Sequence, residues 1–291
     1  MTSSGTLFGY AVSSVFEHES LSSAPARRGT IEIGRRETVP LEAARVTHHH
    51  DGGGSDGLTI ARDADGRILL DCSGAGGFQL DAGALRVLAD RREGSDDLWE
   101  HRLVTVVIPL LLADRGDVAI HAAGIAHRGR AVAFAGASTR GKSTLALAAA
   151  ESGLGVLADD GVVLERRDGG DAIVWPGPAS ARVARAGRPR KETVAFASGP
   201  LLPVPLAAIA VLGPLADDGP VLERVPPTQA VPVLVPSLVF SGTDTVQHAL
   251  RDAAWLASTF PIFRCRMPQG IERLPAALVE VLERIVSAED A

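Results

Sequence analysis

The stretch "AFAGASTRGKSTLAL", residues 133–147, decides how this chain of 291 residues is interpreted. It begins apolar, passes through glycine, hydroxyl-bearing residues and a lysine, and becomes apolar again. Residues 136–144, here called the GKST loop, satisfy the pattern G-x-x-x-x-G-K-[S/T]. The apolar run before the loop predicts a strand, and the run after it predicts a helix. This order favours a phosphate-binding loop over a plain glycine turn with a surface lysine.

Each residue type in the GKST loop has a physical role in that interpretation. Gly136 and Gly141 permit the turn and let backbone N–H groups approach phosphate oxygens. The helix expected to begin near Lys142 directs the positive end of its dipole at the same oxygens. Lys142 is expected to pair with the β- and γ-phosphates of ATP, and the Ser143 hydroxyl to ligate Mg²⁺. The predicted nucleotide-binding residues are Gly136, Ala137, Ser138, Thr139, Arg140, Gly141, Lys142, Ser143 and Thr144.

Two aspartates follow the next predicted strand. "GVLADD" places Asp159 and Asp160 at the carboxyl end of a strand, directly after the helix that follows the loop. Carboxylates at such an edge can bind Mg²⁺ and take a proton from an attacking hydroxyl. Paired acids in a turn are also common solvent-exposed turn formers. Their place after the loop helix favours the functional interpretation. A single histidine upstream, His121, would not be selected from periodicity alone.

The rest of the second half predicts an α/β domain. "GVVLE", "AIVWP", "TVAFA", "LAAIAVLG" and "IFRCRM" are expected strands, and residues 246–260 have helical periodicity. In "IERLPAALVEVLERIV", an apolar face is expected from Leu274, Leu278, Val281, Leu282 and Ile285. The proline-limited segments 200–205 and 214–236 are expected to be loops.

The first part of the chain predicts a mostly β domain. Residues 30–35 alternate, and residues 58–72 are two β-prone runs around a turn, which is typical of a hairpin. We place the boundary between a β-rich domain, 1–97, and a catalytic domain, 98–291. Between residues 30–35 and 58–72 lies "THHHDGGGSDG", residues 47–57, which could suggest a metal site. Adjacent histidines do not share a face, so a solvated loop is the favoured interpretation.

Bulk composition narrows the function classes. The chain has 46% hydrophobic residues, 22% charged residues and a formal net charge of −6, so no bulk attraction to nucleic acid or anionic membrane is expected. Two distant cysteines predict reduced structural thiols. The longest apolar run, residues 103–113, is too short to span a bilayer and predicts a buried helix. Without a visible signal peptide, the expected location is cytoplasmic.

With these residues assembled, residues 115–165 resemble the catalytic core of HPr kinase/phosphorylase. The resemblance rests on "HAAGIAHRGRAVAFAGASTRGKST" followed by "GVLADD". It implies an α/β phosphate-loop domain akin to that of phosphoenolpyruvate carboxykinase. It also implies the activity of the HPr kinase family, which phosphorylates a serine hydroxyl of a protein. Thr139 and Thr144 depart from the family pattern, which usually has glycine and glutamate there.

Carried over residue by residue, the resemblance makes Lys142 the phosphate ligand and Ser143 a Mg²⁺ ligand. Asp159 and Asp160 supply the general base and the second metal contact, with Asp160 assigned to the metal, although the sequence does not apportion the two roles. His121 lies near the acceptor and the γ-phosphate. Arginines and a lysine further along are candidate substrate contacts, the alternative being a solvated basic loop: Arg182, Arg185, Arg188, Arg190 and Lys191.

A looser likeness covers more of the chain. "FGYAVSS" and the tail "RCRMPQGIERLPAALVEVL" are similar to HPr-kinase-like proteins of peptide-maturation clusters, including the kinases of lasso-peptide pathways. The expected function is ATP- and Mg²⁺-dependent phosphorylation of a serine of a peptide or protein. The C-terminal serine of a lasso precursor peptide is one candidate acceptor. Nucleic acid and membrane are not expected partners, while a homo-oligomer is possible. A nucleotide-dependent binding protein and a kinase of small-molecule hydroxyls are the alternatives.

Overall fold

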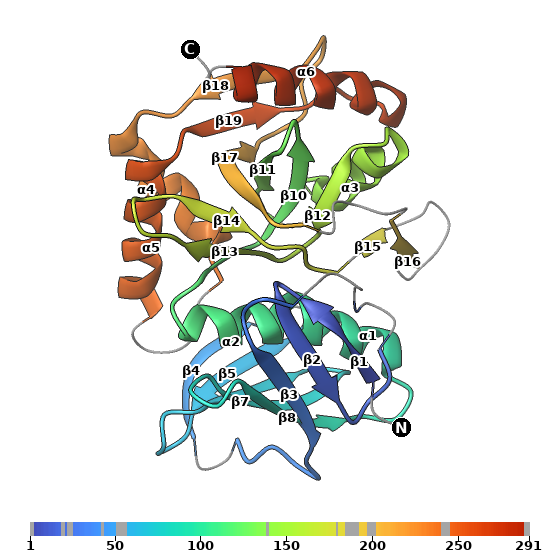
Figure 1. Ribbon diagram of the computed structural model, residues 1–291, viewed down its shortest axis with the longest axis vertical. Coiled ribbons are helices and arrows are strands. Elements are labelled where there is room, and N and C mark those ends of the chain that lie inside the picture. Colours follow the sequence, from blue (N-terminus) through green and yellow to red (C-terminus); the bar gives the residue numbers. More distant parts are fainter. Residues whose placement is uncertain are drawn as a thin grey trace.

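The computed structural model describes residues 3–18, 21, 26–41, 44–50, 57–137, 140–178, 180–183, 192–196, 202–239 and 245–287. It is a mixed α/β structure with several sheets. Figure 1 shows the N-terminal strands at one end and the remaining sheet and helices at the other, with α1 and α2 between them. Within the described residues, no helix is long and apolar enough to cross a membrane. The cytoplasmic location stays a prediction.

The N-terminal sheet has eight strands in the order β1-β2-β3-β8-β7-β6-β5-β4. Strand β3 pairs in parallel with both β2 and β8, and the remaining neighbours are antiparallel. The predicted hairpin of residues 58–72 is confirmed as β5 and β6. The strands are β1 (Ser3–Leu7), β2 (Tyr10–Ser14), β3 (Thr30–Arg35), β4 (Arg45–His50), β5 (Leu58–Arg62), β6 (Ile68–Cys72), β7 (Gly76–Asp81) and β8 (Arg86–Arg91).

The histidine segment is a correction to the sequence analysis. His48, His49 and His50 were expected in a solvated loop, but they form the end of β4, paired antiparallel with β5. The reason is tertiary, because an edge strand needs only one partner and the β-prone run of β5 supplies it. Residues 51–56, the glycine-rich remainder of the expected loop, lie outside the described residues.

The second sheet follows the order β12-β10-β11-β17-β14-β13-β9, and β19 joins it beside β17 and β18. Strand β17 is central, since it pairs in parallel with both β11 and β19. The strands are β9 (Val118–Ile120), β10 (Ala122–His127), β11 (Arg130–Ala135), β12 (Gly155–Ala158), β13 (Val162–Arg166), β14 (Ala172–Val174), β17 (Val204–Leu212), β18 (Val221–Arg224) and β19 (Ile262–Arg266). A separate pair is formed by β15 (Ser180–Val183) and β16 (Glu192–Ala195).

Helices cover this sheet on two sides. The helices are α1 (Asp96–Arg102), α2 (Ile108–Asp114), α3 (Lys142–Glu151), α4 (Pro227–Leu234), α5 (Thr245–Thr259) and α6 (Leu274–Ser287), with a π-helical turn, Leu103–Val107, between α1 and α2. Helices α3 and α6 share one apolar cluster, while α4 and α5 belong to another. The predicted apolar face of α6 is confirmed: Leu274, Leu278, Val281, Leu282 and Ile285 are buried. Burying each such side chain contributes about 1.5–3 kcal/mol.

The expected proline-limited loops are wrong in part. Strand β17 begins before Pro205, whose missing N–H is tolerated near the start of a strand. Within 214–236, β18 and α4 form. Helix α4 begins at Pro227, and proline at the first helical position has its φ already set for a helix and lacks an N–H that would have no partner there.

The long apolar run forms the buried helix that was expected, and its packing bears on the domain boundary. Trp99, Leu103, Val107 and Leu111 from α1, the π turn and α2 are buried in the same apolar cluster as the N-terminal strands. The helical segment 96–114 therefore packs on the N-terminal sheet. The division into 1–97 and 98–291 stays a prediction.

Candidate functional site

The GKST loop connects β11 to α3 as its sequence predicted. Gly136 follows the last residue of β11 and has φ +149°, and a Cβ placed there would lie 3.2 Å from the Leu212 carbonyl oxygen of β17. Gly141 precedes the first residue of α3 with φ +88°, a left-handed conformation that favours glycine. Ser138 and Thr139 lie outside the described residues. Both glycines thus occupy positions where a side chain would be strained or crowded.

Lys142 is folded back onto the loop that precedes it. Its Nζ donates hydrogen bonds to the carbonyl oxygens of Gly136 at 2.9 Å and Ala137 at 3.1 Å. The residue is 4% exposed. A buried ammonium needs acceptors, and loop carbonyls provide them here. Lys142 is therefore held at the loop, where an oxygen-rich ligand such as a phosphate could replace carbonyl oxygens as its acceptor.

Asp159 is the least compensated charge of the site. It directly follows β12, is 2% exposed, and neither of its carboxylate oxygens makes a hydrogen bond of normal geometry within the described residues. Burial, and then the negative charge of Asp160, raises the pKa of Asp159 to about 7. The Ser143 hydroxyl, the Asp160 backbone N–H and Lys142 lie near enough to oppose that rise in pKa. Asp159 thus faces the GKST loop without a full partner.

Asp160 sits in a different environment from its neighbour. Its side chain is 19% exposed, and its backbone has φ +61°, which is uncommon for a residue other than glycine. The Nδ1 of His121 lies 2.9 Å from the Asp160 carbonyl oxygen, and the Nε2 of His121 lies 4.0 Å from its Oδ1. The structure thus brings together His121, which lies between β9 and β10, and Asp160, which lies between β12 and β13.

A second histidine was missed by the sequence analysis. The Nε2 of His101, on α1, lies 3.9 Å from Oδ2 of Asp160, whereas His121 approaches the other carboxylate oxygen, Oδ1. His101 is 59 residues away in the chain, and "LWEHR" carries no motif. Its only sequence signal is a polar residue in the turn before a strongly apolar run, which is too common to select.

The donor set at the loop fits Mg²⁺. Among the residues that the structure describes, no group of three or more histidine, cysteine or acidic side chains is arranged to hold a metal ion by itself. Mg²⁺ commonly binds through one or two carboxylates together with substrate phosphates and water, so a closed protein cage is not needed. The Ser143 hydroxyl beside the unsatisfied oxygens of Asp159 supplies hard oxygen ligands of this kind.

The predicted substrate contacts remain untested. Arg182 lies in β15, but its side chain is not among those described. Arg185, Arg188, Arg190 and Lys191 lie outside the described residues. Arg140 is exposed in the middle of the GKST loop.

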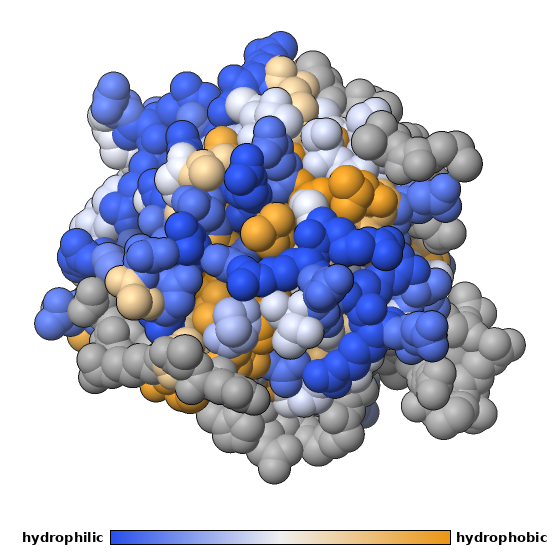
Figure 2. Space-filling model, turned by 90° about the horizontal axis from the view of Figure 1, so that it is seen from below, coloured by the Kyte–Doolittle hydropathy of each residue, from blue (hydrophilic) through white to orange (hydrophobic). Residues whose placement is uncertain are grey.

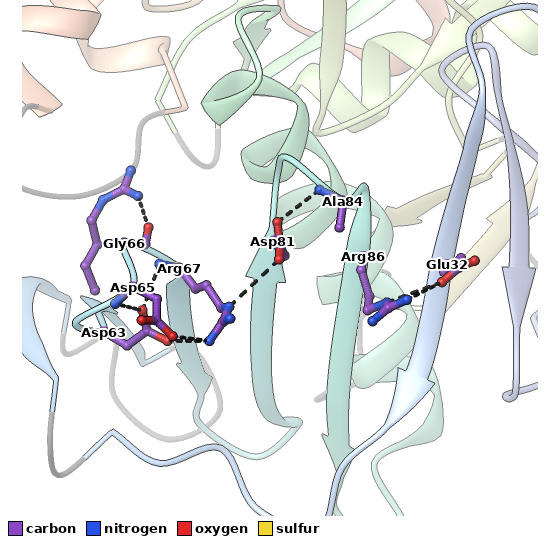
Figure 3. Close-up of polar contacts among 9 residues, drawn as sticks. Glu32, Asp63, Asp65, Gly66, Arg67, Asp81, Ala84 and Arg86 are labelled. Carbon is purple, nitrogen blue, oxygen red and sulfur yellow. Dashed lines mark hydrogen bonds and ion pairs between the residues drawn. The ribbon is translucent and has the colours of Figure 1, made fainter.

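A cavity of about 270 Å³ lies elsewhere, on the face of the N-terminal sheet that points away from α1 and α2. Its lining is Arg36, Arg67, Gln79, Asp81, Arg86 and Leu88. Arg67 pairs with Asp65 at 2.6 Å and Arg86 with Glu32 at 3.0 Å, so most of the positive charge is compensated (Figure 3). Seen from the N-terminal end, the surface is mainly hydrophilic with apolar patches near its centre (Figure 2). Nothing here resembles the uncompensated charge at the GKST loop.

A further histidine, His18, lies in the N-terminal core beside a serine and a glutamate. The Nε2 of His18 is 2.7 Å from Ser14 Oγ, and its Nδ1 is 4.0 Å from Glu100 Oε1. This order of groups is that of a serine–histidine–acid triad, but Ser14 is 1% exposed. The His18 ring stacks on Trp99, and burial lowers its pKa to about 4. A hydroxyl sealed from substrate is a packing element, not a nucleophile.

Comparisons with known proteins add little to these observations. No protein-family model matches the chain, and no curated protein matches it. Among solved structures, it is similar to the Hpr(Ser) kinase/phosphatase from Coxiella burnetii, with a TM-score of 0.34 and 15% sequence identity over 59% of this chain and 97% of that one. A likeness at this level carries no argument about function.

Proposed function

We propose that this protein is an ATP-dependent kinase that transfers the γ-phosphoryl group to a serine hydroxyl of a peptide or protein. One observation carries the proposal: the buried carboxylate of Asp159 faces Ser143 and Lys142 of the GKST loop, while the more exposed Asp160 follows it. A phosphate loop alone binds nucleotide. A loop with an acid pair at its open end has the groups that phosphoryl transfer to a hydroxyl requires.

The GKST loop would bind the nucleotide. The backbone N–H groups at the start of α3 and the Lys142 ammonium would hold the β- and γ-phosphates, the ammonium exchanging carbonyl oxygens for phosphate oxygens. Its positive charge would then stabilise the transition state as negative charge spreads over the transferred group. Most of the rate enhancement would come from positioning and electrostatics, because phosphoryl transfer needs little covalent help from the protein.

The two aspartates would divide the remaining work. Asp159 is the carboxylate beside Ser143, which favours Asp159 on the metal side, although the sequence analysis had assigned Asp160 there. Bound Mg²⁺ would supply neutralisation of phosphate charge. Asp160, the more exposed of the two, would orient the acceptor hydroxyl and accept its proton. His121, whose ring is anchored to the Asp160 backbone, would border the acceptor.

The acceptor class comes from the resemblance in layout to kinases of peptide maturation. On that basis the C-terminal serine of a lasso precursor is the first acceptor to test. A small-molecule hydroxyl kinase would share every residue of the loop and the acid pair. Self-association of the chain into a homo-oligomer is a separate proposal.

Labelled phosphoryl transfer separates these possibilities. The protein is incubated with γ-labelled ATP and Mg²⁺ in three mixtures, containing serine-terminated peptides, HPr or small alcohols. The proposal expects label on a serine-terminated peptide and none on the matched peptide that ends in alanine. Label only on the alcohols would favour a small-molecule kinase, and ADP release without labelled acceptor would favour a nucleotide-dependent binding protein.

Asp160→Asn is the matched variant for this assay. Asparagine has nearly the same shape but cannot accept the proton, so transfer should fall about 10²- to 10⁴-fold while ATP binding persists. Transfer at the wild-type rate in both Asp159→Asn and Asp160→Asn would exclude the proposed acid pair.

A further inference from the structure

Two imidazoles approach the Asp160 carboxylate, one at each oxygen. Its Oδ1 lies 4.0 Å from Nε2 of His121, and its Oδ2 lies 3.9 Å from Nε2 of His101. These distances are typical of an ion pair and are longer than a hydrogen bond. Contacts in a ligand-free site often tighten when the substrate complex forms, and a shift of about 1 Å would bring either nitrogen within hydrogen-bonding reach.

The two histidines differ in which nitrogen can donate. A carbonyl oxygen only accepts, so the 2.9 Å contact between Nδ1 of His121 and the Asp160 carbonyl requires the proton on Nδ1. The Nε2 of a neutral His121 then carries no proton and cannot donate to the carboxylate. That leaves His101 as the histidine whose Nε2 can donate to Asp160 without the ring becoming charged.

The packing of α1 and of the turn after it holds His101 near Asp160. Helix α1 carries Trp99, which is buried in the N-terminal core, so that helix cannot slide freely. In the π-helical turn that follows, the Thr105 hydroxyl donates to the His101 carbonyl at 2.7 Å. A Cβ placed on Gly161 would lie 3.1 Å from the Thr105 carbonyl oxygen, so the residue after Asp160 is packed directly on this turn. π-helical turns of this kind often occur at functional sites.

We propose that His101 is a positioning residue of the phosphoryl-transfer site, whose imidazole holds the Asp160 carboxylate by donating from Nε2. The role rests on the proposed kinase function. With this role, the site is incomplete without α1, the helix that packs on the N-terminal sheet. Helix α1 carries the imidazole that holds the proposed base, Asp160. Sequence motifs around the GKST loop give no hint of this contribution.

Two variants of His101 and one control test the role. His101→Leu introduces an apolar side chain of moderate size and removes the hydrogen-bond donor. His101→Gln replaces the imidazole N–H with a side-chain amide N–H that can still donate. The control is His127→Ala, which removes a histidine that also faces a carboxylate, Glu283, at 3.2 Å but lies at the end of β10. Each variant is assayed for kcat, for KM of ATP and for thermal unfolding.

His101→Leu should lower kcat about 10- to 100-fold, since misplacing a reacting group by about 1 Å can cost that much. KM for ATP should stay within about threefold, and His101→Gln should recover part of kcat. Combining His101→Leu with Asp160→Asn should be no slower than Asp160→Asn alone, because His101 acts through Asp160. A wild-type kcat in His101→Leu, or fully additive losses in the double variant, would overturn the role.

A spectroscopic arm separates failure of this role from failure of the kinase proposal. If the wild-type protein transfers no phosphate, the kinase proposal fails, and the contact is then judged by NMR of ¹⁵N-labelled histidine side chains. Asp160→Asn should move the ring-nitrogen resonances of His101 and His121 and leave those of His127 in place. Unmoved His101 resonances would refute the contact whatever the activity.

Discussion

Two regions of this molecule gather charged side chains in opposite ways. At the GKST loop, Lys142 and Asp159 are buried, and the Asp159 oxygens make no hydrogen bond of normal geometry in the described structure. On the outer face of the N-terminal sheet, Arg67 and Arg86 are paired with carboxylates and remain well exposed. Exposed pairs contribute little to stability and need no further explanation. A buried, incompletely paired charge is costly, and this difference singles out the GKST loop as the place where a ligand completes the structure.

The largest effect should come from Lys142. Lys142→Ala removes the ammonium that would pair with the phosphates, so affinity for Mg²⁺·ATP should fall at least about 100-fold, as expected for loss of charge-assisted hydrogen bonds. Isothermal titration calorimetry measures this, with Arg128→Ala as a control that removes an exposed charge facing Glu283. Unchanged affinity for Mg²⁺·ATP in Lys142→Ala would mean that this buried ammonium does not bind phosphate. The GKST loop would then not differ in function from the outer face of the N-terminal sheet.

The next effect should appear in stability and should depend on pH. The folded-state pKa of Asp159 is raised to about 7, whereas the unfolded chain has the ordinary value of 3.8. The folded state therefore binds the extra proton between these two values, and stability falls as pH rises from about 4 through 7. Asp159→Asn removes that loss, so without Mg²⁺ and nucleotide it should stabilise the protein at pH 8 by on the order of a few kcal/mol and hardly at all at pH 4.

Urea unfolding of both proteins at the two pH values measures the difference. Equal stability of the wild-type protein and Asp159→Asn at pH 8 would mean that Asp159 is better compensated in solution than its surroundings indicate. A difference that persisted at pH 4 would point to a packing effect of the asparagine instead of the charge.

The smallest effect should come from the exposed pairs. Arg86→Gln breaks the contact with Glu32, and because both side chains are more than half exposed, the free energy of unfolding should change by less than about 1 kcal/mol. The change should shrink further in high salt. A thermal or urea unfolding series at low and high ionic strength checks both points, and a large, salt-insensitive loss would contradict the view of this face as a solvated surface.

Local chemistry made much of the fold and the site predictable. The GKST loop, the acid pair after the next strand, the buried helical run and the apolar face of α6 are each written in consecutive residues or in one periodicity, and the structure has them where the sequence places them. Strand β4 and helix α4 were missed because their polar or proline-rich composition is overridden by pairing and by the position of Pro227.

His101 shows a different limit. Its approach to Asp160 depends on α1 packing against the N-terminal sheet, and on the π-helical turn after α1 packing against Gly161. No short pattern connects residues that far apart, so only the three-dimensional structure brings the second histidine to the carboxylate. The same is true of the burial that raises the pKa of Asp159, which two adjacent aspartates in a sequence do not reveal.

The central claim is that the buried Lys142 and the incompletely paired Asp159 at the GKST loop form a site for a nucleotide with Mg²⁺. The most direct measurement is calorimetric titration of the wild-type protein with a non-hydrolysable ATP analogue, in the presence of Mg²⁺ and in its absence. The account predicts binding that Mg²⁺ tightens at least about tenfold, a gain of about 1.4 kcal/mol, and predicts that Asp159→Asn loses most of that gain. No binding under either condition, or binding that ignores both Mg²⁺ and Asp159, would contradict it.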